Sequence, residues 1–173
     1  MTLPNDTEGS RPPVDGLVVH DAYPHWGMAE FGPCLIVVWR GNVTEEALRK
    51  IGERISLLAA QRPGHCTYLN VIERNSPPPT PPLRKIAMAD IARPGKALTC
   101  IGAVIEGNEF RAALVRAIMT GMTLLRPAGQ PAKFFKTVQE MSRWVQGQLP
   151  DVANLDGQIV LAVEFLRAQL PKA

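Results

Sequence analysis

The sequence has no segment typical of a membrane span or of a secretory signal. Its longest apolar stretches, such as residues 97–104 and 159–166, fall well short of the ~20 apolar residues that cross a bilayer. The first 13 residues include Asp6 and Glu8 and contain no apolar core, which is unlike a secretory signal. We therefore expect a cytoplasmic protein.

Cysteine is scarce, and its spacing carries no motif. The chain has three cysteines, Cys34, Cys66 and Cys100, in or beside apolar runs and without C-x-x-C spacing. This pattern predicts small buried side chains in a reducing compartment. Cys66 follows His65, but neighbours in a strand point to opposite faces, so we expect no catalytic pair there.

Motifs that hold cofactors are absent too. No G-x-x-x-x-G-K or G-x-G-x-x-G occurs, and a net charge of +3 is too small to indicate nucleic-acid binding. His20, Asp21 and His25 form H-D-x-x-x-H, but a metal site needs three or four converging ligands, and a third such as His65 would have to come from another strand. The sequence predicts no catalytic residue, no cofactor and no metal, hence a protein that is not an enzyme.

Proline, by contrast, is abundant, with 16 residues in 173. Because proline lacks a backbone N–H and has a fixed φ, single prolines mark the ends of predicted elements. Five prolines fall within residues 77–82. This cluster predicts a loop stiffened as polyproline, which suits the docking of a partner.

Apolar periodicity predicts strands that alternate with helices. The apolar run 34–40, bounded by Gly-Pro and Gly-Asn, predicts a central strand buried on both faces. The other predicted strands are 17–20, 26–31, 65–73, 97–105 and 133–136. The first predicted helix ends at residue 62 and is capped by either Asn42 or Thr44. The other predicted helices are 81–93, 108–126, 138–149 and 156–170. This alternation implies an α/β sheet with right-handed crossovers.

Three segments carry a resemblance to a known family: CLIVVWRGNV (34–43), CIGAVIEG with FRAALVRAIMTGMTLL (100–125), and KFFKTVQEMSRWV (133–145). Together they resemble the SpoIIAA-like (STAS/SEC14-type) proteins of bacteria. The resemblance implies a mixed sheet of four to five strands flanked by helices. We expect a disordered tail over 1–13, a STAS-like domain over 14–149, and an extra C-terminal helix within 150–173.

The resemblance also points to a candidate switch. Anti-sigma-factor antagonists of this family are phosphorylated on a serine or threonine at the start of the second helix. The matching positions here are Ser76 and Thr80, but the family's Asp-Ser-Gly turn is missing and prolines occupy the loop. Thr80 is predicted either as a plain helix cap or as a regulatory phosphorylation site. The stiff loop favours a constitutive binding module.

We therefore predict a non-enzymatic regulatory or scaffolding protein that acts through protein contacts. Its candidate partner surface is the positive charge of the second predicted helix, Arg84, Lys85 and Arg93, which suits an acidic protein or an anionic lipid. Alternatively, these side chains form an ordinary solvated helix face.

The alternative function is a small-molecule or lipid-binding module. Its apolar pocket would lie between helices and sheet, lined by Phe110, Met119, Met122 and the last helix. That helix is apolar around more than half of its circumference, so it either covers the sheet or forms a homodimer interface.

Overall fold

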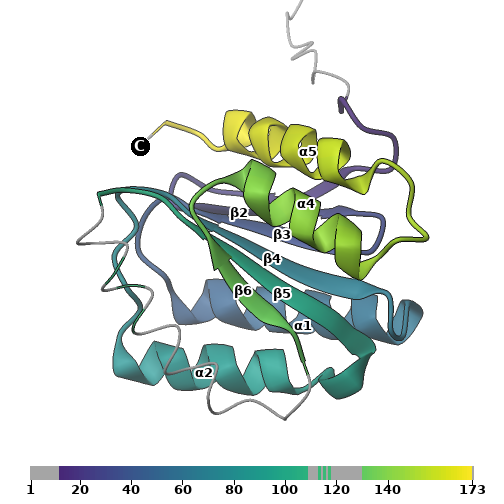
Figure 1. Ribbon diagram of the computed structural model, residues 1–173. Coiled ribbons are helices and arrows are strands. Elements are labelled where there is room, and N and C mark those ends of the chain that lie inside the picture. Colours follow the sequence, from purple (N-terminus) through teal and green to yellow (C-terminus); the bar gives the residue numbers. More distant parts are fainter. Residues whose placement is uncertain (1–11, 109–112, 114, 116, 118–129, 173) are drawn as a thin grey trace, which may run out of the picture.

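The fold is built on one mixed sheet whose strands lie side by side in chain order (Figure 1). The structure, a computed structural model, describes residues 12–108, 113, 115, 117 and 130–172. In this described part the sheet has six strands. They are β1 (Val18–Ala22), β2 (Trp26–Phe31), β3 (Cys34–Trp39), β4 (Cys66–Ile72), β5 (Leu98–Ile105) and β6 (Ala132–Phe135).

The sheet is larger than the family resemblance implied. The first three strands form an antiparallel meander, and β3 to β6 pair in parallel. A turn of two residues, Gly32-Pro33, joins β2 to β3, and Gly32 has a φ of 53° that suits glycine. The expected count of four to five strands was therefore wrong, because the N-terminal meander enlarges the sheet. The α/β class and the mixed sheet are confirmed.

Helices cover both faces of the sheet (Figure 1). On one face lie α1 (Glu45–Gln61) and α2 (Pro81–Ala92), and on the other α4 (Val138–Gln148) and α5 (Leu155–Gln169). A short 3-10 helix, Gly95–Ala97, leads into β5. No helix among the described residues has the length and apolarity to cross a membrane.

The central strand β3 is buried along its whole length, as the sequence predicted. Its side chains alternate between two cores: Leu35 and Val37 pack towards α1, and Ile36 and Val38 towards α5. Complete burial of each such side chain contributes roughly 1.5–3 kcal/mol. The strand therefore ties both helical layers to the sheet.

Local capping fixes where the helices begin. Thr44 accepts a hydrogen bond from the amide of Ala47 at 3.2 Å, and Thr137 accepts one from Glu140 at 3.2 Å. The Glu140 carboxylate reaches back to the amide of Lys136 at 3.0 Å, much as in a capping box. Both starts agree with the sequence prediction.

The last helix, α5, covers the sheet beside α4. Its apolar face is fully buried, including Leu155, Ile159 and Leu166. Leu161 points away and is 49% exposed. Most apolar side chains of α5 are therefore buried within this chain. A homodimer through α5 stays a prediction.

Candidate functional site

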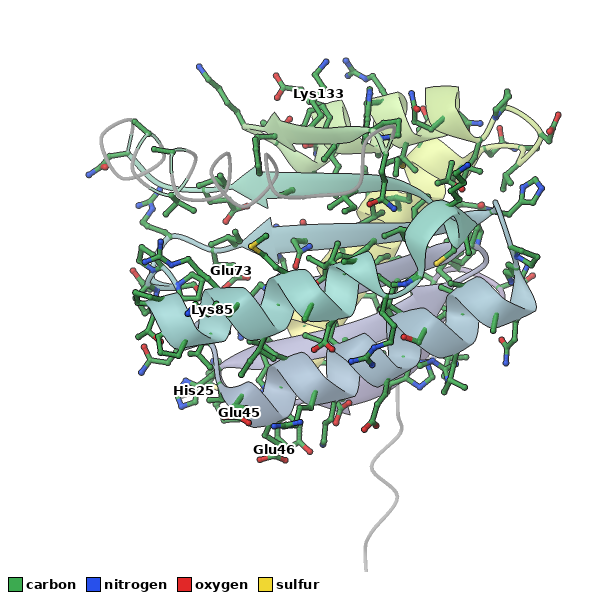
Figure 2. All side chains as sticks on the ribbon, turned by 90° about the horizontal axis from the view of Figure 1, so that it is seen from below. His25, Glu45, Glu46, Glu73, Lys85 and Lys133 are labelled. Atoms are coloured by element: carbon green, nitrogen blue, oxygen red, sulfur yellow. The ribbon has the colours of Figure 1, made fainter. Side chains whose placement is uncertain are left out.

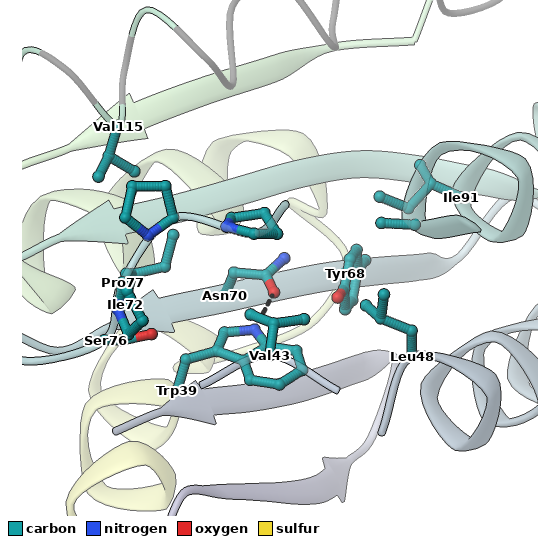
Figure 3. A pocket seen from close by; sticks show the side chains of 13 residues that line it. Trp39, Val43, Leu48, Tyr68, Asn70, Ile72, Ser76, Pro77, Ile91 and Val115 are labelled. Carbon is teal, nitrogen blue, oxygen red and sulfur yellow. Dashed lines mark hydrogen bonds between the residues drawn. The ribbon is translucent and has the colours of Figure 1, made fainter. Parts of the chain in front are cut away.

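A pocket of about 60 Å³ opens on the α1–α2 face of the sheet, near the carboxyl ends of β3 and β4 (Figure 3). Its floor comes from Trp39, Tyr68 and Asn70, and residues 77–79 lie across it as a roof. The side wall is provided by Val43, just before α1, and by the helical residues Leu48, Ala87, Ile91 and Val115. We call this cavity the proline-roofed pocket.

The pocket differs from the one expected from the sequence. Phe110, Met119 and Met122 lie outside the described residues. The last helix packs on the opposite face of the sheet, so it does not line this pocket. The apolar stripe of α5 is buried against the sheet and α4. A pocket that α5 would line together with Phe110, Met119 and Met122 stays a prediction.

The floor carries two polar side chains in an otherwise apolar setting. The Trp39 indole N–H donates to Oδ1 of Asn70 at 3.2 Å (Figure 3). Burial raises the pKa of the Tyr68 hydroxyl, and a hydrogen bond with Asn70 opposes that rise. Tyr68 therefore stays neutral at physiological pH. Asn70 and Tyr68 offer hydrogen bonds to an occupant without offering charge.

Ser76 fixes the beginning of the roof. Its hydroxyl donates to the carbonyl of Gly41 at 2.9 Å, and its amide donates to the carbonyl of Glu73 at 3.0 Å. The residue is only 1% exposed. Phosphorylation of Ser76 would therefore require this end of the loop to open, and its regulatory role stays a prediction.

Thr80 occupies the N-cap position of α2, but its side chain makes no capping hydrogen bond. It is exposed, so an enzyme can reach it. The next two residues are Pro81 and Pro82, which lack the backbone N–H groups that hold a phosphate at a helix start. Modification of Thr80 stays a prediction, and the start of α2 offers little help in holding the phosphate.

The predicted cationic surface is divided between two places. Arg84 and Lys85 lie in the first turns of α2, next to the roof. Arg93 lies at the other end, and its guanidinium donates to Asp90 Oδ1 at 2.6 Å. Arg74, which lies three residues before Pro77 of the roof, was not singled out in the sequence. Within the described part of the chain, Arg74, Arg84 and Lys85 make no ion pair.

Asp90 is a buried carboxylate at the contact between α1 and α2. It is 8% exposed and lies against Gly52 of α1. Its Oδ2 is buried and has no hydrogen-bond partner among the described residues. Desolvation raises the pKa of this carboxyl, while the nearby guanidinium groups of Arg93 and Arg49 oppose the rise. The sequence alone gave no sign of this group.

Replacing Asp90 by asparagine is expected to stabilise the fold at neutral pH. A carboxyl whose pKa is raised by folding contributes most below its unfolded pKa, and this contribution is lost as pH rises through the folded pKa. The gain of Asp90→Asn should therefore shrink on acidification below the unfolded value. Urea unfolding of both proteins at neutral and acidic pH measures it, and an equal difference at both would contradict the assignment.

A network of ion pairs lies at the carboxyl ends of the parallel strands. Arg40, Glu73 and Glu106 directly follow or closely follow β3, β4 and β5. Arg40 Nε lies 2.9 Å from Glu73 Oε2, and Arg167 of α5 lies 2.5 Å from Glu106 and 3.3 Å from Glu73. Arg40 also donates to the carbonyl of Arg167 at 3.2 Å. The network connects the end of α5 to three strands.

The three histidines do not converge. His20 lies 3.4 Å from Glu30, His25 packs against Gly41 beyond the end of β3, and His65 is exposed before the start of β4. The described residues contain no group of three His, Cys, Asp or Glu side chains able to hold a metal.

The three cysteines are free and buried. Burial raises the pKa of each thiol to about 12, so each is protonated at neutral pH. A protonated buried thiol is a poor nucleophile. The arrangement fits small core side chains.

A search of solved structures matched this chain to two chains, of which one is described here. It is an anti-sigma factor antagonist from Mycobacterium paratuberculosis. The TM-score is 0.42 at 14% sequence identity, over 76% of this chain and 96% of that chain. No family model and no curated protein matches the sequence.

Proposed function

We propose that the protein is a non-enzymatic regulatory module that acts through protein contacts made by the 77–82 loop and α2. One observation carries the proposal: an apolar pocket is lined by α2 and by the segment before it, and these carry Arg74, Arg84 and Lys85, which form no ion pair among the described residues. Such a combination of an apolar depression and a charged rim is typical of protein interfaces.

The packing of α2 supports the same surface. Asp90 is its one fully buried residue, whereas α1 buries seven. The apolar residues Leu83, Ile86 and Ile91 are only partly buried. A helix that buries so little of itself in its own domain retains apolar surface for a partner.

The alternative, binding of a small molecule or lipid, fits the cavity less well. Ligand pockets typically enclose about 300–1,000 Å³, and a cavity of about 150 Å³ is known to hold benzene. The proline-roofed pocket is about 60 Å³. A lipid chain would enter only if the roof moved away. Native mass spectrometry of protein from its own host tests this alternative through any retained ligand mass.

The proposal is tested by replacing Pro77, Pro78 and Pro79 with serine and comparing captured proteins after cross-linking in the native host. We expect the wild type to retain partners that the loop variant loses by about tenfold, the effect of roughly 1.4 kcal/mol. Arg143→Glu, an exposed charge reversal on α4, is the matched control. Identical partner sets for all three proteins would refute the proposed surface.

A further inference from the structure

We infer that the proline-roofed pocket receives one aliphatic side chain from an acidic peptide segment of a protein partner. This rests on the proposed function and adds to it the chemistry of the partner.

The volume of the pocket limits the size of the partner side chain that can enter it. On the scale of the ~150 Å³ cavity that holds the six carbons of benzene, a cavity of about 60 Å³ takes roughly two to three carbons. The branched end of a leucine side chain, Cγ with its two methyl groups, has three carbons. One branched aliphatic side chain therefore fits, whereas an aromatic ligand needs more room.

The lining of the pocket favours an uncharged partner side chain. None of the described residues lining the pocket carries a charge. Val43, Ala87 and Ile91 provide apolar contact, and the buried indole of Trp39 is held by Asn70 (Figure 3). A charged side chain placed there would be desolvated without a counter-ion.

The cationic side chains near the pocket favour acidic residues on either side of the partner's aliphatic side chain. Arg84 lies three residues before Ala87 and seven before Ile91, so the three share one face of α2. Its side chain is partly exposed and forms no ion pair among the described residues. Lys85 follows Arg84 and is exposed farther around α2, and Arg74 lies two residues before Ser76. Carboxylates of a partner supply the acceptors that these groups lack.

Acidic residues near the same edge are already paired. Glu45 binds Arg49 at the start of α1, and Glu73 binds Arg40 and Arg167. The charge left over beside the pocket is therefore positive. A positive surface favours an acidic partner segment over a basic one. Figure 2 labels Glu45, Glu73 and Lys85.

The proline roof lowers the conformational entropy that is lost when a partner binds. Consecutive prolines restrict the backbone before any partner arrives, so less conformational entropy is lost on binding. Ser76 holds the start of this segment to Gly41. Among the described residues, the pocket is thus shaped before a partner binds.

Selection from a random peptide display library tests the inference without choosing a sequence in advance. We expect enrichment of peptides with one Leu, Ile or Val flanked by Asp or Glu. A synthetic enriched peptide should then bind with an affinity that Ala87→Leu, which fills the pocket, lowers at least about tenfold. Arg84→Glu with Lys85→Glu should lower it similarly, and Arg143→Glu should leave it unchanged. Circular dichroism checks that each variant is folded.

Three results would overturn the inference: no enrichment, an enriched motif without acids or without an aliphatic position, or unchanged affinity in both pocket-rim variants. Binding to phosphatidylserine vesicles in place of peptides would assign the cations to a membrane instead. If captured partners still depend on Pro77–Pro79 while the library yields no acidic motif, the proposed function survives and this inference fails. If no partner depends on the loop, the proposed function itself fails.

Discussion

Gly52→Ala is expected to destabilise the protein, although alanine is the better helix former. A Cβ on Gly52 would lie 2.5 Å from Cγ and 2.8 Å from Cβ of Asp90. The Asp90 Cβ is attached to the backbone of α2, so relief requires α2 to move away from α1. Overpacking of this kind costs about 1–3 kcal/mol and outweighs the ~1 kcal/mol gain in helix propensity. Urea unfolding measures the difference.

The matched control is Gly147→Ala in α4, where nothing lies within 4 Å of the added Cβ. That change should stabilise by up to ~1 kcal/mol, since only propensity acts. Combining Gly52→Ala with Asp90→Gly should recover stability beyond the sum of the single changes, because the overlap is removed. If Gly52→Ala stabilises the protein as much as Gly147→Ala does, the close packing of α1 against α2 at Gly52 is contradicted. A change here also shifts Ala87 and Ile91, so it should weaken binding at the proline-roofed pocket.

Arg167→Met is expected to cost about 1–3 kcal/mol of unfolding free energy, less than the 3–5 kcal/mol of a fully buried pair. Arg167 is 19% exposed and interacts with three carboxylates: Glu73, Glu106 and Glu164. Methionine keeps much of the aliphatic contact but leaves Glu106 without its short partner at 2.5 Å. Thermal and urea unfolding at low ionic strength measure the loss.

Arg143→Met on α4 is the control for removal of a positive charge, because Arg143 is exposed and forms no ion pair within the described residues. It should change stability by less than ~0.5 kcal/mol. The loss in Arg167→Met should also shrink as salt is added, since the network is partly exposed. Equal losses for the two variants would show that the network adds nothing to stability.

Much of the fold was readable because its signals are local. The run 34–40 between two glycine-containing turns marks a buried strand, and Thr44 and Thr137 precede apolar stripes of helical period. Each signal lies within a few residues of the element it defines. The strand count of the sheet was missed because the resemblance implied four or five, although the short N-terminal runs were recognised as strand candidates.

The site was largely hidden because it is assembled from distant segments. Trp39, Asn70 and Ala87 meet only after the parallel crossovers bring β3, β4 and α2 together. Helical geometry does explain one error: Arg84 and Arg93 are nine residues apart, which places them on opposite sides of α2. A sign of the ion-pair network was present, since charged residues follow the apolar runs that became β3, β4 and β5.

The order of the strands also has a consequence for synthesis. Because spatial order equals chain order, each strand adds to the edge left by the one before it, and none must insert between strands already paired. A growing chain can therefore extend the sheet from β1 towards β6 as it leaves the ribosome. The face that carries Ala29, Ile36 and Val38 stays uncovered until α5 arrives. We expect a chain halted before residue 155 to aggregate through that face.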